Sequence, residues 1–294
     1  MTPFELLEPA TLDEAIGLLD PDDPGVRVIA GATALVPMMK ARLFRPTRLV
    51  SLRRLDGALR GVRAETGGLR IGALTTLTEL EQSAQVRAAA PVVSRTLRTL
   101  SNVRIRNIAT LGGHLAHGDP HMDLPPVLMT LGARVRAVGR RGERWITVDD
   151  LILGYYRTAL AADELVADLH VPTQPADARA WYEKFTALSA DDWPAVGVAV
   201  WYRTAGSRIT EARVAVGAAT ERPVRIAAAE AILTGEAVGN ETFRRAADAA
   251  AEGVDPLADI RGSAAYKREM VRVHVRRALT NAQRGAGPLE PAAE

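Results

Sequence analysis

The chain contains no cysteine among its 294 residues. This absence excludes disulfide bonds, a thiolate nucleophile, and thiolate ligation of zinc or iron–sulfur clusters within the chain. It also excludes a flavin that is attached through cysteine. Aromatic residues make up only 4% of the sequence, and no basic tract is interleaved with them. Nucleic-acid binding is therefore not expected.

Charge of one sign and long apolar runs are lacking as well. The 37 basic residues nearly balance the 35 acidic residues. No apolar run reaches about 18 residues, so no transmembrane helix is expected. The first residues lack the charged start of a signal peptide, and we therefore expect a cytoplasmic protein. The length predicts about two domains, at roughly 100–200 residues each.

The order of predicted helices and strands indicates an α+β protein. Apolar segments after the turn at 20–25 and near residue 50 predict strands. Thr11 and Glu14 have the spacing of a capping box, which predicts a helix that begins after Thr11. Beyond a linker at 173–180, two strand patterns precede three helical ones. Strands followed by helices are typical of an antiparallel sheet with helices on one face.

Two glycine-containing segments are candidates for binding an anion. The first is AGATA at 30–34, directly after a predicted strand, and the second is TLGGH at 110–114. Small residues let a backbone approach a ligand closely, and successive N–H groups that point at one place bind anions. Neither segment has the G-x-G-x-x-G spacing of a Rossmann site. Taken alone, the first segment is more typical of a plain strand-to-helix turn, and the second only suggests an anion site.

The second segment lies beside a group of possible metal ligands. Three histidines and two aspartates lie here, namely His114, His117, His121, Asp119 and Asp123. These side chains suit zinc or iron. However, Gly118 and Pro120 interrupt any helix, so we predict no helix here and none of the regular spacing of a helical metal motif. A polar loop that holds a turn or a ligand is favoured over a metal site.

Taken together, these segments resemble the FAD-binding medium subunits of molybdenum hydroxylases, which include carbon monoxide dehydrogenase and xanthine dehydrogenase. Four stretches carry the resemblance: AGATALVPMMK at 30–40, RNIATLGGH at 106–114, GDPHMDLPP at 118–126 and KFTALSADDWPAVGVA at 184–199. Their order and spacing agree with the family over about residues 1–285. The pattern RNxATxGG is its most specific part.

The resemblance implies an α+β FAD-binding fold of the vanillyl-alcohol-oxidase (PCMH) type. We expect an N-terminal FAD-binding subdomain at 1–57 and a second one at 58–175, with FAD between them. A C-terminal α+β domain with an antiparallel sheet would occupy 176–285 and close over the isoalloxazine. A disordered tail would follow at 286–294.

The resemblance also implies roles for individual residues toward a non-covalent FAD. Both glycine segments would wrap the pyrophosphate, and Asp123 would accept hydrogen bonds from the ribitol or ribose. The backbone near Val166 would meet the adenine, Lys184 would lie near the flavin or its phosphates, and Trp193 near the isoalloxazine. The expected cofactor-binding residues are Ala30, Gly31, Ala32, Thr33, Ala34, Thr110, Leu111, Gly112, Gly113, His114, Asp123, Val166, Lys184 and Trp193. No residue is assigned as catalytic or as a metal ligand.

Three departures from the family pattern bear on this site. Ala32 replaces a glycine, which requires either a negative φ or tolerated strain. His114 replaces a frequent asparagine. Ala187 and Leu188 stand where the family commonly has an arginine pair, which leaves the electron acceptor open.

The implied function is electron transfer within an oxidoreductase complex. A large molybdenum-cofactor subunit would oxidise the substrate, and a small subunit with [2Fe-2S] clusters would pass electrons singly to FAD. Reduced FAD would give two electrons to an external acceptor, in a dimer of heterotrimers. Two alternatives stay open. One is a stand-alone flavin or metal-dependent enzyme, with any metal at His114, His117 and His121, and the other is a scaffold of this fold that has lost FAD.

Overall fold

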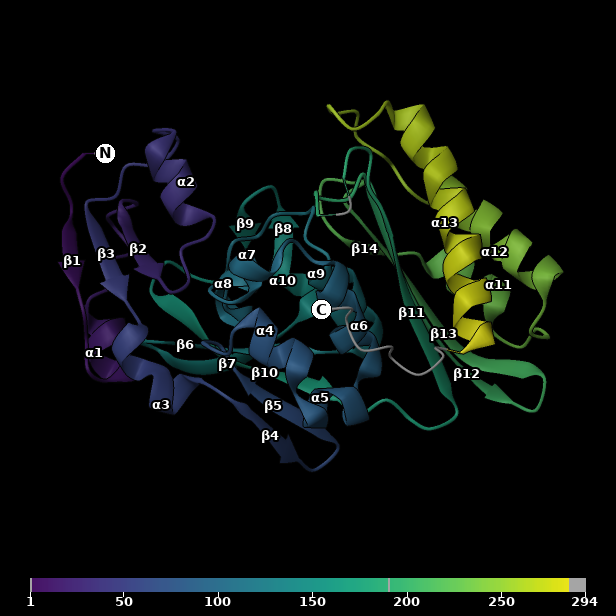
Figure 1. The fold of residues 1–294 in the computed structure, drawn as a ribbon, viewed down its shortest axis with the longest axis horizontal. Helices are drawn as coiled ribbons and strands as arrows, with labels where there is room; N and C mark the ends of the chain where they lie inside the picture. Colours follow the sequence, from purple (N-terminus) through teal and green to yellow (C-terminus); the bar gives the residue numbers. More distant parts are fainter. Residues whose placement is uncertain (1, 190, 286–294) are drawn as a thin grey trace.

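The described residues form three larger β-sheets, which follow one another along the chain (Figure 1), and one two-stranded sheet. The structure is a computed structural model that describes residues 2–189 and 191–285. The tail expected at 286–294 lies outside the described residues. The three sheets fall within the ranges 1–57, 58–175 and 176–285, and the division into domains stays a prediction.

The first sheet is parallel, with the strand order β1-β3-β2. Its strands are β1 (Glu5–Leu7), β2 (Val26–Ile29) and β3 (Arg48–Ser51), and its helical elements are α1 (Leu12–Gly17), α2 (Leu35–Lys40), η1 (Arg53–Leu55) and α3 (Asp56–Leu59). The predicted capping box is confirmed, because the Thr11 hydroxyl accepts from the N–H of Glu14 at 3.1 Å. The apolar core of this sheet also includes Leu165 and Ala167 of the second unit. The first two units therefore share a core.

The second sheet is antiparallel, with the order β4-β5-β10-β6-β7. Its strands are β4 (Val62–Glu65), β5 (Gly68–Gly72), β6 (Arg134–Gly139), β7 (Gly142–Thr147) and β10 (Glu164–Pro172). A small pair, β8 (Ile152–Gly154) and β9 (Arg157–Thr158), stands apart from it. The helices are α4 (Leu77–Gln82), α5 (Ala84–Ala89), α6 (Pro91–Thr99), α7 (Val103–Arg106), α8 (Leu111–Ala116), α9 (Leu124–Leu131) and α10 (Val148–Leu151). Their apolar side chains and one face of the sheet form the largest core cluster.

The third sheet has the antiparallel order β11-β12-β13-β14. Its strands are β11 (Ala178–Phe185), β12 (Val196–Ala205), β13 (Arg208–Gly217) and β14 (Val224–Arg225), and its helices are α11 (Ala227–Leu233), α12 (Asn240–Glu252) and α13 (Ala264–Arg284). Successive side chains of a strand point to opposite faces. Val198 and Val200 therefore pack with these helices, whereas Ala199 and Trp201 pack with the core of the second unit. Figure 1 shows α11, α12 and α13 on the outer face.

The prediction of no helix in the histidine-rich stretch is wrong for its first part, which contains His114, and correct for 118–123. Helix α8 begins after Thr110, whose hydroxyl accepts from the N–H of Gly113 at 3.3 Å, and ends before Gly118 with its φ of +67°. Gly118 does interrupt the helix, but one residue after its C-cap at His117. Six residues are too few to show apolar periodicity.

The structure was also searched for membrane-spanning helices. Within the described part of the chain, no helix has the combined length and apolarity that crossing a bilayer requires.

Candidate functional site

The segment after β2 forms an open backbone nest. The N–H groups of Gly31, Ala32, Thr33 and Ala34 have no hydrogen-bond partner among residues 2–189 and 191–285. Ala32 has a φ of +59°, and alternation of right- and left-handed residues turns successive N–H groups toward one place. Of the two alternatives at Ala32, the strained positive φ is therefore the one that the chain adopts. The nest suits an anion such as a phosphate.

Gly31 brings the nest against the segment that leads into α8. A Cβ at position 31 would lie 2.1 Å from the carbonyl oxygen of Ile108, which is closer than any real contact. Only glycine therefore lets these two backbones meet. The structure thus brings both predicted glycine segments to one place.

The second segment offers fewer free donors than its two glycines suggest. The N–H of Leu111 donates to the carbonyl of Thr75 at 2.9 Å, and that of Gly112 donates to Ala73 at 2.8 Å. Gly113 is solvent-exposed, and a Cβ there would meet only the Thr110 hydroxyl, at 3.0 Å. The segment therefore supplies a small, exposed surface beside the nest, and the nest itself supplies the open N–H groups.

His114 has a buried ring nitrogen that makes no hydrogen bond. Its Nε2 is buried and has no hydrogen-bond partner among the described residues. Burial lowers the pKa of His114 to about 4, and the charge of His117 adds to this effect. The ring is therefore neutral near neutral pH and has one donor and one acceptor nitrogen. A buried polar atom of this kind usually has a partner, and here a ligand would supply it.

Asp123 and Lys184 are brought together in a buried network. The Tyr182 hydroxyl donates to Oδ1 of Asp123 at 2.8 Å, and Nζ of Lys184 donates to Oδ2 at 3.3 Å. Lys184 also donates to the carbonyl of Thr99 at 2.9 Å. Burial raises the pKa of Asp123 to about 6, although Lys184 and Tyr182 act to lower it. Both carboxylate oxygens therefore already have protein partners, which leaves only part of their acceptor capacity for a sugar.

Tyr182 is a member of this network that the sequence did not reveal. It packs against the core of the second unit, and it lies two positions before Lys184 on β11. Residues i and i+2 of a strand share a face. That spacing was the signal that both side chains could reach the same acidic partner.

Trp193 lies beside His121. Its side chain is 41% exposed, and its ring stacks on His121 with 5.8 Å between centroids and 20° between planes. Nδ1 of His121 lies 2.9 Å from Oδ1 of Asp119, and Nε2 lies 3.4 Å from Oδ2 of Asp259. No local pattern singled out Asp259, because it is 138 residues from His121 in the chain.

The remaining predicted residues do not form a metal centre. Among the described residues, no three side chains from His, Asp and Glu are placed to hold a metal ion. His117 packs against Tyr156, with 5.0 Å between ring centroids. Val166 is buried in β10, where it pairs with Ala137, in the core behind α8.

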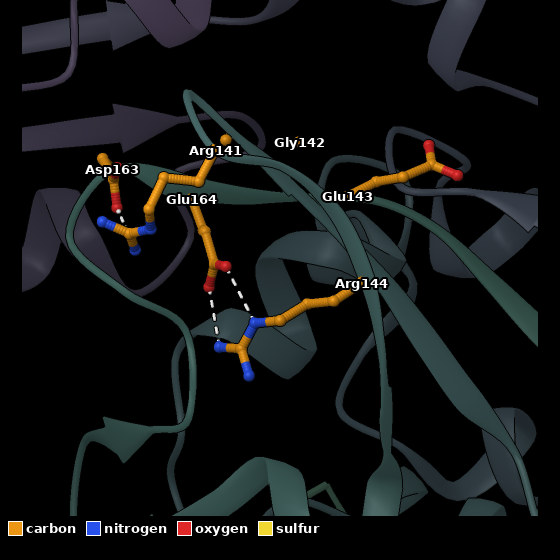
Figure 2. Close-up of a pocket in the computed structure, with 7 residues that line it drawn as sticks. Arg141, Gly142, Glu143, Arg144, Asp163 and Glu164 are labelled. Atoms are coloured by element: carbon orange, nitrogen blue, oxygen red, sulfur yellow. Dashed lines mark hydrogen bonds and ion pairs between the residues drawn. The ribbon is translucent and has the colours of Figure 1, made fainter.

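A separate cavity lies at the turn between β6 and β7 (Figure 2). It has a volume of about 160 Å³, and its lining includes none of the residues expected to bind a cofactor. Arg141 is paired with Asp163 at 3.2 Å, and Arg144 with Glu164 at 2.8 Å. Its charged groups therefore already compensate one another.

Comparison with known proteins identifies two matching families. Residues 2–174 match the FAD binding domain in molybdopterin dehydrogenase, and residues 180–282 match the CO dehydrogenase flavoprotein C-terminal domain. The nicotine 6-hydroxylase medium subunit of Paenarthrobacter nicotinovorans is 36% identical over 276 residues, which cover 93% of this chain and 95% of that one. The carbon monoxide dehydrogenase medium chain of Hydrogenophaga pseudoflava is 33% identical over 280 residues, and this alignment covers 95% of this chain and 96% of that one.

Solved structures agree with these matches. A carbon monoxide dehydrogenase from Hydrogenophaga pseudoflava superimposes with a TM-score of 0.93 at 35% identity, covering 97% of this chain and 99% of that one. Quinoline 2-oxidoreductase from Pseudomonas putida superimposes with a TM-score of 0.90 at 31% identity, covering 96% and 98%. The expected fold class is confirmed. The open nest, the close backbone approach at Gly31 and the unpaired His114 nitrogen fit a phosphate group such as those of FAD.

Proposed function

Since this chain belongs to the family of FAD-binding medium subunits of molybdenum hydroxylases, we propose that the nest at 31–34 binds the FAD pyrophosphate. The observation that carries the proposal is the row of four N–H groups without a protein partner among the described residues, at the point where Gly31 meets Ile108 and Ala109. Such groups stabilise negative charge at short range. His114 would donate to the same phosphates through its neutral ring.

The other assignments complete this proposal. Tyr182 and Lys184 orient the Asp123 carboxylate, whose remaining lone pairs would accept from the ribitol or ribose. Trp193 would lie beside the isoalloxazine, and the backbone near Val166 would meet the adenine. FAD supplies the redox chemistry when it is bound, and the chain binds and orients it.

The proposed role is electron transfer inside a larger oxidoreductase. A large subunit with the molybdenum cofactor and a small subunit with [2Fe-2S] clusters would assemble with this chain as a dimer of heterotrimers. The relatives named as medium subunit and medium chain support assembly with further subunits, and a chain without cysteine needs a partner to carry thiolate-bound clusters. We propose that the complex works in the cytoplasm. Co-purification from the native source, followed by cell fractionation, tests both statements.

The test of the FAD site compares two glycine variants of the full chain. Gly31→Ala forces the two glycine segments apart and is expected to abolish stoichiometric flavin binding, measured by the flavin absorption of the purified protein. Gly17→Ala is the matched control, because a Cβ there meets nothing within 4 Å, and it should bind FAD like the parent. A colourless parent that takes up no FAD would favour the scaffold alternative. Equal binding by both variants would remove residues 31–34 from the site.

A further inference from the structure

His121 lies at the centre of a chain of polar contacts that the proposed FAD contacts do not use. It is 7% exposed and bridges two carboxylates, Asp119 and Asp259. Burial acts to raise the pKa of Asp119, but the hydrogen bonds from the ring and the backbone N–H of His121 outweigh it and lower the pKa. Asp119 is therefore ionised near neutral pH, and Nδ1 of His121 donates to it.

Residues of the C-terminal unit hold Asp259, the second of these two carboxylates. Nζ of Lys267, which is 1% exposed, lies 2.8 Å from Oδ2 of Asp259. The N–H of Arg261 donates to Oδ1 of the same carboxylate at 2.8 Å. Burial acts to raise the pKa of Asp259, but these contacts lower it below its usual value. The imidazole edge of His121 thus lies between two immobilised anions.

The plane of the imidazole in turn faces Trp193. The two rings are within 20° of parallel, and the guanidinium of Arg261 lies 5.9 Å from the centre of the indole ring. Arg261 also pairs with Asp192, at 3.6 Å, whose carboxylate accepts from the N–H of Trp193 at 2.7 Å. The tryptophan remains 41% exposed. His121 therefore supports one face of a ring that is still partly open to solvent.

We propose that His121 is the positioning residue for Trp193. Asp119 and Asp259 fix the plane of the imidazole, and the imidazole fixes the plane of the indole against which the flavin ring rests. The inference rests on the proposed function, because it takes the open part of Trp193 to face FAD. The proposal gives a common role to three segments that are distant in the sequence and in contact in the fold, namely 119–121, 192–193 and 259–261.

The first test follows Trp193 directly in the full chain. The four tryptophans are replaced by fluorotryptophan, and the Trp193 signal is assigned by its loss in Trp193→Phe. His121→Gln is expected to shift the Trp193 fluorine resonance and leave those of Trp145, Trp181 and Trp201 in place. His117→Gln is the matched control, because that ring contacts Tyr156, and it should leave the Trp193 resonance in place. An unmoved Trp193 resonance in His121→Gln overturns the proposal.

The second test measures whether the two rings act as a unit on FAD. Because a ring pair contributes modestly, His121→Gln and Trp193→Phe should each raise the FAD dissociation constant by about two- to tenfold. The double variant should be no weaker than the weaker single variant. Multiplied effects would show that His121 acts independently of Trp193 and would overturn the proposal.

Two further arms keep the tests decisive. If His121→Gln does not fold, Asp259→Asn can replace it. This variant weakens the contact of His121 with the less buried of its two carboxylates and should shift the same fluorine resonance. If the parent binds no FAD, the proposed function fails, whereas the fluorine spectrum of the FAD-free chain still tests the coupling of His121 to Trp193. If the parent binds FAD but the Trp193 resonance does not move in His121→Gln, the positioning role of His121 is contradicted and the proposed FAD site is not.

Discussion

Ala32 places a methyl group where the backbone favours glycine. Its φ of +59° lies in the left-handed region, which costs an L-residue with a Cβ about 1 kcal/mol or more. The surrounding contacts must hold this conformation, because an isolated alanine would avoid it. The residue is therefore strained in the nest that we assign to the phosphates.

Relief of this strain should be measurable. Ala32→Gly is expected to raise the free energy of unfolding by about 1 kcal/mol and to retain FAD binding, because it keeps the same backbone path. Urea denaturation measures the change. Ala34→Gly is the control, because φ at that position is −98° and added backbone freedom should lower the stability by about 0.5–1 kcal/mol. Equal changes in both variants would contradict the strain.

His114 predicts a dependence of stability on pH. Its pKa is about 4 in the folded chain and 6.5 as a free group, so the unfolded chain binds the extra proton first as the pH falls. The contribution of the neutral ring is complete above pH 6.5 and is lost toward pH 4. The difference in unfolding free energy between the parent and His114→Gln should therefore shrink by up to about 3 kcal/mol over this window. A constant difference from pH 7 to pH 4 in urea titrations would contradict the assignment.

At the scale of elements, β11 and the start of α9 are joined by a buried ion pair. Lys184 and Asp123 have side chains that are 7% and 5% exposed. A buried charge that loses its partner is costly, whereas removal of both charges is often tolerated. The stability of the contact between the third sheet and α9 should therefore change with the protonation of Asp123.

Lys184→Met should lower the free energy of unfolding by about 3 kcal/mol at pH 8, where Asp123 is ionised. The loss should be smaller at pH 5, because the pKa of Asp123, already about 6, rises further without the ammonium and the carboxyl group is protonated. Denaturation of the single and double variants at both pH values measures this. The variant with both Asp123→Asn and Lys184→Met should recover part of the loss. Equal losses at pH 5 and pH 8 would show that Asp123 is not the coupled group.

Local patterns predicted elements well and long-range contacts poorly. The capping box at Thr11 and the strand pattern of β12 depend on neighbours in the chain, and both were predicted correctly. Helix α8 was missed because six residues carry too little periodicity. The contact between His121 and Asp259 depends on how the three sheets pack, and no local spacing encodes it. Elements that follow a local motif could therefore be predicted from the sequence, whereas contacts that are assembled from distant segments could not.

At the scale of the whole molecule, FAD binding should stabilise the first two units together. The nest belongs to the first unit, its wall at Ile108 belongs to the second, and the two share an apolar core. A ligand at 100 times its dissociation constant raises the unfolding free energy by about 2.7 kcal/mol. Thermal unfolding of the full chain at increasing FAD concentrations measures this rise. Gly31→Ala should show none of it, and an equal rise in that variant would contradict the site.

The stretch around Pro120 joins the second unit to the third by contacts that do not depend on the peptide connection between them. The carbonyl of Pro120 accepts from the N–H of Ala218 at 3.0 Å, and Asp123 and His121 reach Lys184 and Asp259. The residues between β10 and β11, 173–177, carry the connection but few of these contacts. A backbone cut within 173–177 would therefore leave two fragments that are still held together by these contacts and by the apolar core that Ala199 and Trp201 share with the second unit. The folded subunit should in this sense survive a proteolytic nick at this connection.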